Sequence, residues 1–144
     1  MSDKMRWRYA DTNPVVSDVS STTVIEIGDL VCLDGDETKP ASEFTDLEEF
    51  KDKFLGVAMQ RSRKGESGPI RVATTGVFEF DCDKGVMNLG GLITVRHNGL
   101  QLVPQAVELT KNRNIAIARV AKRKLHDCMS VYIDVCSTIM RGGI

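Results

Sequence analysis

Short runs of β-branched and aliphatic residues, separated by glycine, aspartate and asparagine, fill the chain from residue 22 onward. This pattern is typical of strands joined by frequent turns. The runs that fit it best span residues 22–27, 30–33, 55–59, 70–80, 90–95, 115–121 and 130–135. At 144 residues the chain has the length of one domain and can bury a core without metals or disulfides. We therefore expect an all-β fold, a mainly antiparallel small barrel or sandwich.

Glycines mark the places where these strands should bend or turn. Gly28 and Gly76 interrupt apolar runs, as expected for a bulge or a barrel corner. Asn98-Gly99 is typical of a two-residue hairpin turn. Residues 115–121 and 130–135 are expected to pair as antiparallel strands. The side chains expected to point inward from the second of these strands are Val131, Ile133 and Val135.

Residues 42–54 depart from the strand pattern and indicate a helix. Their apolar side chains recur at offsets of three or four residues, and these are Phe44, Leu47, Phe50 and Phe54. Thr45 followed by Glu48 is a capping box, so the helix should begin there. We expect one short amphipathic helix whose aromatic face packs on the sheet.

Residues 1–21 are polar and rich in turn residues, with Asn13-Pro14 as an interruption. They predict an extended N-terminal arm in front of a β domain over residues 22–144. The arm carries the aromatic and basic side chains Arg6, Trp7, Arg8 and Tyr9. Aromatic rings are costly to leave in water, so either the arm folds back on its own domain or these four residues bind a partner.

The charge balance argues against two classes of partner. There are 19 lysines and arginines against 20 aspartates and glutamates, a formal net charge of −1. General nucleic-acid binders and membrane-surface modules carry a large positive excess, so neither nucleic acid nor membrane is an expected partner. No stretch approaches the length of an apolar membrane span, and the N-terminus lacks the apolar region of a signal peptide. We expect synthesis in the cytoplasm.

The cysteines give no metal-site pattern. Cys32, Cys82, Cys128 and Cys136 form no C-x-x-C pair and have no group of histidines nearby. Each lies in or beside an apolar run, where a free thiol behaves as a small hydrophobic side chain. We expect reduced structural thiols, no metal and no cofactor.

Two basic clusters are further candidates for partner contacts. They comprise Arg61, Arg63 and Lys64, and then Lys122, Arg123 and Lys124. Both fall in expected loops and lack the regular aromatic residues of a single-stranded nucleic-acid groove. A solvated rim or a protein contact fits them better.

Catalytic signals are weak. The two histidines, His97 and His126, fall in different loops, and neither has an activated serine or cysteine in its local sequence. The nucleophile-elbow, zincin and P-loop motifs are absent. We therefore expect no enzyme. The alternative is a small ligand-binding or enzymatic barrel in which His97, Asp83 and Glu79 converge on a cavity.

The order of the glycine-punctuated strands resembles the capsid decoration (cement) proteins of tailed bacteriophages. The segments that carry this resemblance are residues 24–31, 54–58, 70–80, 90–95, 115–121 and 130–135. It covers roughly residues 22–139. The helix at residues 45–54 and the aromatic and basic arm depart from the family pattern.

The resemblance implies a structural protein of the virion. Proteins of this kind are β-barrels or β-sandwiches on the outside of an icosahedral head, commonly trimers, that clamp neighbouring major capsid subunits. The implied partner is thus the major capsid protein, with a homo-oligomer, preferably a trimer, as the binding form. Deletion of residues 1–21 would then weaken capsid binding and leave the barrel folded. A component of the phage tail or baseplate is the alternative structural role.

Overall fold

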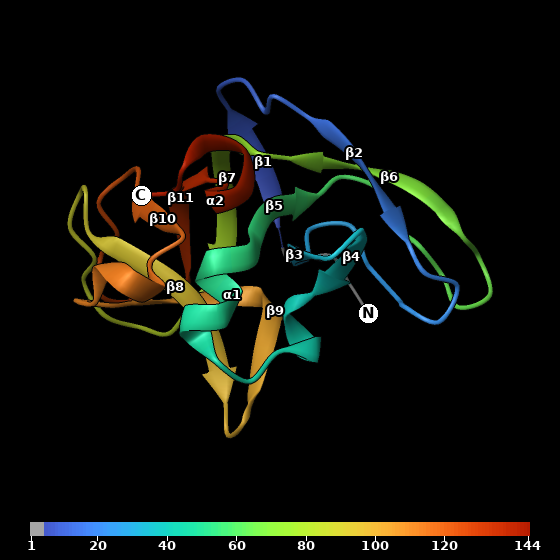
Figure 1. The fold of residues 1–144 in the computed structure, drawn as a ribbon. Coiled ribbons are helices and arrows are strands. Elements are labelled where there is room, and N and C mark those ends of the chain that lie inside the picture. The colour runs from blue at the N-terminus through green and yellow to red at the C-terminus, as the bar shows by residue number, and fades with distance from the viewer. Residues whose placement is uncertain (1–4) are drawn as a thin grey trace.

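The structure is a computed structural model in which residues 5–144 are described. Its elements are, in chain order, β1 (Arg6–Tyr9), β2 (Val15–Val19), β3 (Leu30–Asp34), β4 (Glu37–Pro40), η1 (Ala41–Glu43), α1 (Leu47–Lys53), β5 (Phe54–Ala58), β6 (Gly68–Ala73), β7 (Thr75–Asp81), β8 (Leu92–Asn98), β9 (Gln101–Leu109), η2 (Arg113–Ile115), β10 (Ala118–Val120), β11 (Ser130–Cys136) and α2 (Thr138–Arg141). Strands dominate and the helices are short (Figure 1). The expected all-β fold with a short helix is confirmed.

The larger sheet has six strands in the order β1-β7-β11-β10-β8-β9. Strand β9 also pairs with β7, in parallel, where Ala106 lies opposite Asp81. This second pairing closes β7, β11, β10, β8 and β9 into a small barrel, and β1 extends it along the free part of β7. All the other pairings in this sheet are antiparallel.

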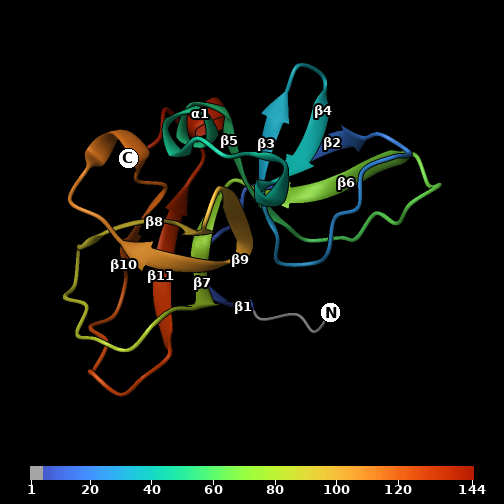
Figure 2. The ribbon, with the colours of Figure 1, turned by 90° about the horizontal axis from the view of Figure 1, so that it is seen from below.

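The smaller sheet has five strands in the order β2-β6-β5-β3-β4 and lies beside the barrel (Figure 2). Its two edge strands meet, because the buried Thr38 hydroxyl on β4 donates a hydrogen bond to the buried Ser17 hydroxyl on β2. The sheet therefore curls around a small core of its own. That core contains Val19, Ile25, Val31, Leu55, Ala58, Ile70 and Val72.

The main core fills the barrel and the space between the barrel and the smaller sheet. Its largest members include Phe50, Phe54, Phe78, Phe80 and Ile133, all essentially without exposed surface. The aromatic face predicted around α1 is buried, with the rings of Phe44 and Phe50 in an edge contact at 5.7 Å. The helix begins two residues later than the capping-box prediction, because the Asp46 carboxylate accepts the hydrogen bond from the Glu48 backbone N–H.

The N-terminal segment is part of the β domain, so the predicted boundary after residue 21 is wrong for the described residues 5–21. β1 pairs with β7 and β2 pairs with β6, so the segment adds one strand to each sheet. Met5 and Val19 are buried in the two cores. Deleting residues 1–21 would remove both strands, so the structure leads us to expect that this deletion destabilises the β domain. Residues 1–4 of the predicted arm lie outside the described residues.

The chain crosses between the sheets at two neighbouring places. Thr74 separates β6 from β7, so the predicted continuous run 70–80 is two strands in different sheets. The backbone N–H and hydroxyl of Thr74 donate to the carbonyls of Thr12 and Asn13 in the β1–β2 connection, at 2.9 and 2.7 Å. These bonds tie the two crossings together. Gly76, with φ of +125°, follows at the start of β7, close to the bend that its position predicted.

Other strand predictions were met in part. Residues 22–27 form only an isolated bridge, between Ile25 and Ser62, and β10 is limited to three residues. The hairpin turn lies one residue later than Asn98-Gly99, because Asn98 already pairs with Gln101. The antiparallel pairing of β10 with β11 is confirmed. The three inward residues expected on β11, Val131, Ile133 and Val135, are all buried.

Candidate partner-binding site

A polar network crosses the outer face of β1, β7 and β11. The Arg8 guanidinium on β1 donates to Glu79 on β7, with its Nε atom 3.0 Å from Oε1. The Ser130 hydroxyl on β11 donates to the other carboxylate oxygen of Glu79. The bond from Ser130 and the pair with Arg8 lower the pKa of Glu79, and that carboxylate in turn raises the pKa of Arg8. Glu79 is therefore ionised and fully engaged, and it makes a poor general base.

Tyr132 on β11 joins two candidate regions that are distant in the sequence. The Arg8 Cζ atom lies 5.3 Å from the centre of the Tyr132 ring, and the Lys122 Nζ atom lies 5.2 Å from it. Both distances suit cation–π contacts. The N-terminal segment and the second basic cluster thus meet on one exposed face, which the sequence alone did not indicate.

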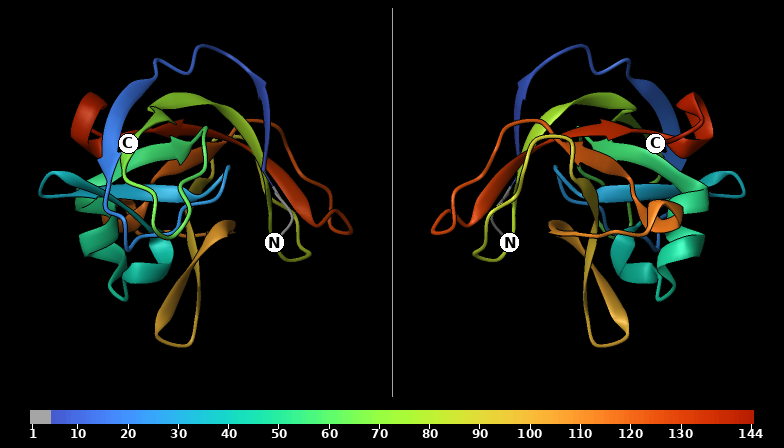
Figure 3. Two further views of the ribbon diagram at one scale, coloured as in Figure 1. Left: turned by 90° about the vertical axis from the view of Figure 1, so that its right-hand side faces the viewer. Right: turned by 90° about the vertical axis from the view of Figure 1, so that its left-hand side faces the viewer.

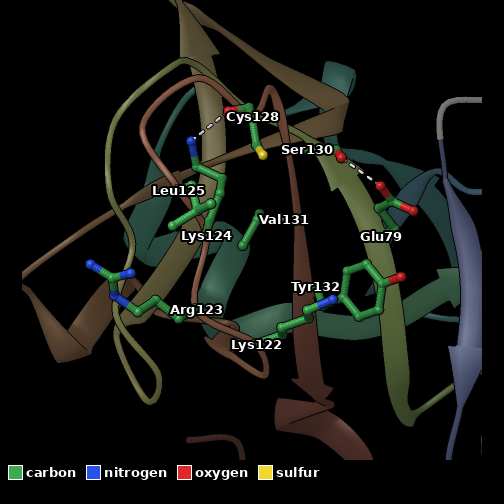
Figure 4. Close-up of a pocket in the computed structure, with 9 residues that line it drawn as sticks. All are labelled: Glu79, Lys122, Arg123, Lys124, Leu125, Cys128, Ser130, Val131 and Tyr132. Carbon is green, nitrogen blue, oxygen red and sulfur yellow. Dashed lines mark hydrogen bonds between the residues drawn. The ribbon is translucent and has the colours of Figure 1, made fainter.

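A cleft of about 260 Å³ opens beside this network (Figure 4). Its lining residues are Glu79, Lys122, Arg123, Lys124, Leu125, Cys128, Ser130, Val131 and Tyr132. Figure 4 shows Glu79, Ser130 and Tyr132 together on one side of the cleft, with Arg123 extending away from the other labelled side chains. The cleft joins an apolar floor to a cationic rim, a combination suited to binding rather than to proton transfer.

Lys124 does not lie on the exposed rim that the sequence predicted for it. Only 4% of its surface is exposed. Its ammonium group donates to the Asp83 carbonyl at 3.1 Å and to the Cys128 carbonyl at 2.6 Å. Lys124 therefore fixes the loop from the inside and is removed from the candidate contacts, whereas Lys122 and Arg123 are exposed.

The first basic cluster lies far from this face. The loop of residues 61–67 is at the outer end of β6, and the 121–129 loop is at the opposite end of the molecule (Figures 1 and 2). Arg61 forms an ion pair with Glu26 at 3.5 Å, and Arg63 and Lys64 are exposed. The two predicted basic clusters therefore belong to different surfaces.

The aromatic residues of the N-terminal segment are half exposed on β1. Trp7 and Tyr9 each keep 52% of their surface exposed. The Trp7 indole N–H donates to the Ala10 carbonyl at 3.2 Å, so the ring folds against its own segment. Arg6 is the register partner of Glu79. All four predicted residues are exposed, on a strand that folds back on its own domain (Figure 3).

The alternative catalytic set does not assemble. His97 pairs with Glu108 at 3.1 Å, and Asp83 pairs with Arg96 at 3.0 Å. Glu79 lines the cleft described above, whereas His97 lines a separate hollow beside Arg96. The prediction that His97, Asp83 and Glu79 converge on one cavity is therefore wrong.

The cysteines are unpaired in residues 5–144, and they are not all packed in apolar surroundings. Cys32 and Cys82 are buried, and burial raises the pKa of both thiols. Cys128 is exposed at the cleft, which corrects the expectation of a structural role for it. Within the described part of the chain, no three His, Cys, Asp or Glu side chains gather as a metal site. No helix in the same residues is long and apolar enough to span a membrane.

Sequence reasoning missed Ser130 and Tyr132, and it named Glu79 in a different role. The available signal was the alternation of β11, which places both side chains on the face opposite to Val131 and Ile133. Comparison with known proteins adds no further residues, because neither family models nor curated protein sequences match this chain. The functional argument therefore depends on the geometry of this face and on the strand order.

Proposed function

We propose that the protein is a capsid decoration protein that binds the outer surface of an icosahedral phage head and stabilises contacts between major capsid subunits. The observation that supports it is the exposed face on which Arg8 and Lys122 both contact the Tyr132 ring, with Arg123 at the border of the adjoining cleft. A decoration protein works through its outside, and this face offers charged and aromatic groups without an assembled catalytic set. The resemblance of the strand order to decoration proteins supplies the identity of the partner.

The proposed binding form is a homo-oligomer, with a trimer favoured. A symmetric oligomer on a symmetric shell binds through several copies of one weak contact, and the second and third contacts form at high effective concentration. Light scattering of the purified protein measures the oligomeric state, and a monomer at working concentration would remove this part of the proposal.

The experiment that tests the function compares two matched charge reversals. Lys122→Glu with Arg123→Glu changes the proposed face, and Arg63→Glu with Lys64→Glu makes the same change in charge on the distant loop. All four side chains are exposed, so neither double variant should unfold the protein. Purified heads of the source phage, stripped of the protein, are incubated with each form, and occupancy is measured by sedimentation and gel densitometry.

The first double variant should lose at least about tenfold in affinity for heads, because it places carboxylates where the proposed contact needs cations. The second double variant should stay within about twofold of the unmodified protein. Equal loss from both variants would assign the effect to net charge and not to this face. Failure of the unmodified protein to bind heads, or its recovery with tails instead, would overturn the proposed function.

A further inference from the structure

Two adjacent residues beside the cleft show the reverse of the usual burial: the charged one is buried and the apolar one is exposed. Lys124 is only 4% exposed, whereas Leu125 is 60% exposed. Burying an ammonium group and leaving a leucine in water both oppose folding, so the usual arrangement would be the reverse. Residues whose placement opposes folding are typical of functional sites. Leu125 is therefore available for contact with a partner surface.

The loop that displays Leu125 is held firmly by its neighbour, the loop of residues 82–91. Backbone bonds join Met87 to Lys124 in both directions, at 3.1 and 2.8 Å, and the Gly85 N–H donates to the His126 carbonyl at 2.8 Å. This antiparallel register places Val86 opposite Leu125, and Val86 is 44% exposed. The two loops run side by side away from the barrel (Figure 2). An apolar contact made by preorganised loops loses little entropy on binding.

Cations border this apolar contact. Lys122 and Arg123 line the same cleft as Leu125, and neither forms an ion pair with a described residue. Two of the nearby acids are already paired with arginines, Glu79 with Arg8 and Asp83 with Arg96. The surface around Leu125 is therefore locally positive, although the whole chain has a net charge of −1. Its complement is a surface that carries carboxylates.

We propose that Val86, Leu125, Lys122 and Arg123, the two-loop patch, dock an apolar protein surface bordered by carboxylates. This inference rests on the proposed function only for the identity of the partner, which would be the head surface. The contact would place an aliphatic or aromatic partner side chain against Leu125 and in the cleft, and a carboxylate against Lys122 and Arg123. A second copy of the chain fits less well in a two-fold contact through this patch, because it would bring the same cations together.

The first test compares two exposed leucines. Leu125→Gln removes the apolar centre of the two-loop patch, and Leu100→Gln makes the same change at the tip of the β8–β9 hairpin, where Leu100 is 85% exposed. Neither change touches the core. Affinity for stripped heads should fall at least about fivefold for Leu125→Gln, as for a central contact residue, and stay within about twofold for Leu100→Gln.

The second test does not depend on heads. A capped peptide of alternating Asp and Leu is titrated into the labelled protein, with the Lys and Leu peptide of the same length as control, and amide shifts are followed by NMR. The acidic peptide should shift the amides of residues 85–87 and 122–129 with millimolar affinity, and Leu125→Gln should weaken that binding. The basic peptide should leave them unchanged.

The two tests separate the proposals. If the peptide binds at the two-loop patch while heads do not bind, the patch is correct and the proposed function is wrong. If heads bind but Leu125→Gln changes neither head binding nor peptide shifts, the patch is wrong and the proposed function stands. Dissociation of a homo-oligomer by Leu125→Gln, seen by light scattering, would show that a second copy covers the patch and would overturn the inference.

Discussion

Strands β1 and β2 come from one polar N-terminal segment, yet they are held in different ways. All four residues of β1 are exposed, and apart from backbone pairing with β7 the strand is held by surface contacts such as the Arg8 pair with Glu79. β2 buries Ser17 and Val19 inside the curled sheet. The comparison shows that one polar segment can supply both a strand that contributes to a core and a strand whose side chains are all exposed. It also predicts different costs for equal changes in the two strands.

The largest effect is expected from a charge placed in the buried half of β2. Val19 is 3% exposed, so Val19→Asp should destabilise the fold by about 4 kcal/mol or more, because the carboxylate would be buried without a partner. Val16 on the same strand is 66% exposed, and Val16→Asp should cost about 0.5 kcal/mol or less. Urea unfolding followed by circular dichroism measures both. Similar costs would mean that β2 does not close the small core.

The next effect concerns the hydroxyl pair that joins the edges of the smaller sheet. Ser17→Ala should cost about 1–3 kcal/mol, because the buried Thr38 hydroxyl loses its acceptor. Thr38→Val should cost less free energy of unfolding in the Ser17→Ala variant than in the unmodified protein, because the hydrogen bond between the two hydroxyls is already broken. A double-mutant cycle by urea unfolding measures the coupling. Strictly additive costs would show that the two edges are held together by apolar packing alone.

A smaller and pH-dependent effect is expected at the contact that holds β1. Because Ser130 and Arg8 lower the pKa of Glu79 in the folded protein, its carboxylate stabilises the fold at pH values above the ordinary glutamate pKa of about 4.3. This contribution is lost as the pH falls through the lowered folded pKa. The stability difference between the unmodified protein and Glu79→Gln should therefore be constant above about pH 6 and shrink in acid. A difference that grows in acid would contradict the assignment.

The sequence predicted those features that depend on nearby residues. The alternation of β11 and the aromatic face of α1 follow from side-chain periods of two and 3.6 residues, so both could be read directly. The partnership of Arg8 with Glu79 depends on a strand register between distant segments, and no local pattern encodes it. Lys124 illustrates the same limit, because its burial depends on a carbonyl supplied by Asp83 from another loop. Several residues of the candidate face could thus be named from the sequence, but the contacts that bring them together could not.

A small effect on stability is expected at Trp7, an aromatic residue that is half exposed on β1. Half of its surface is exposed and its indole N–H bonds to the nearby Ala10 carbonyl, so Trp7→Ser should cost about 1 kcal/mol or less. Trp7 is the only tryptophan in the chain, so unfolding must be followed by circular dichroism rather than by fluorescence. A cost approaching that of Val19→Asp would mean that β1 is held by buried side-chain packing. β1 would then contribute to stability as β2 does, and the proposal that its exposed side chains serve binding would be contradicted.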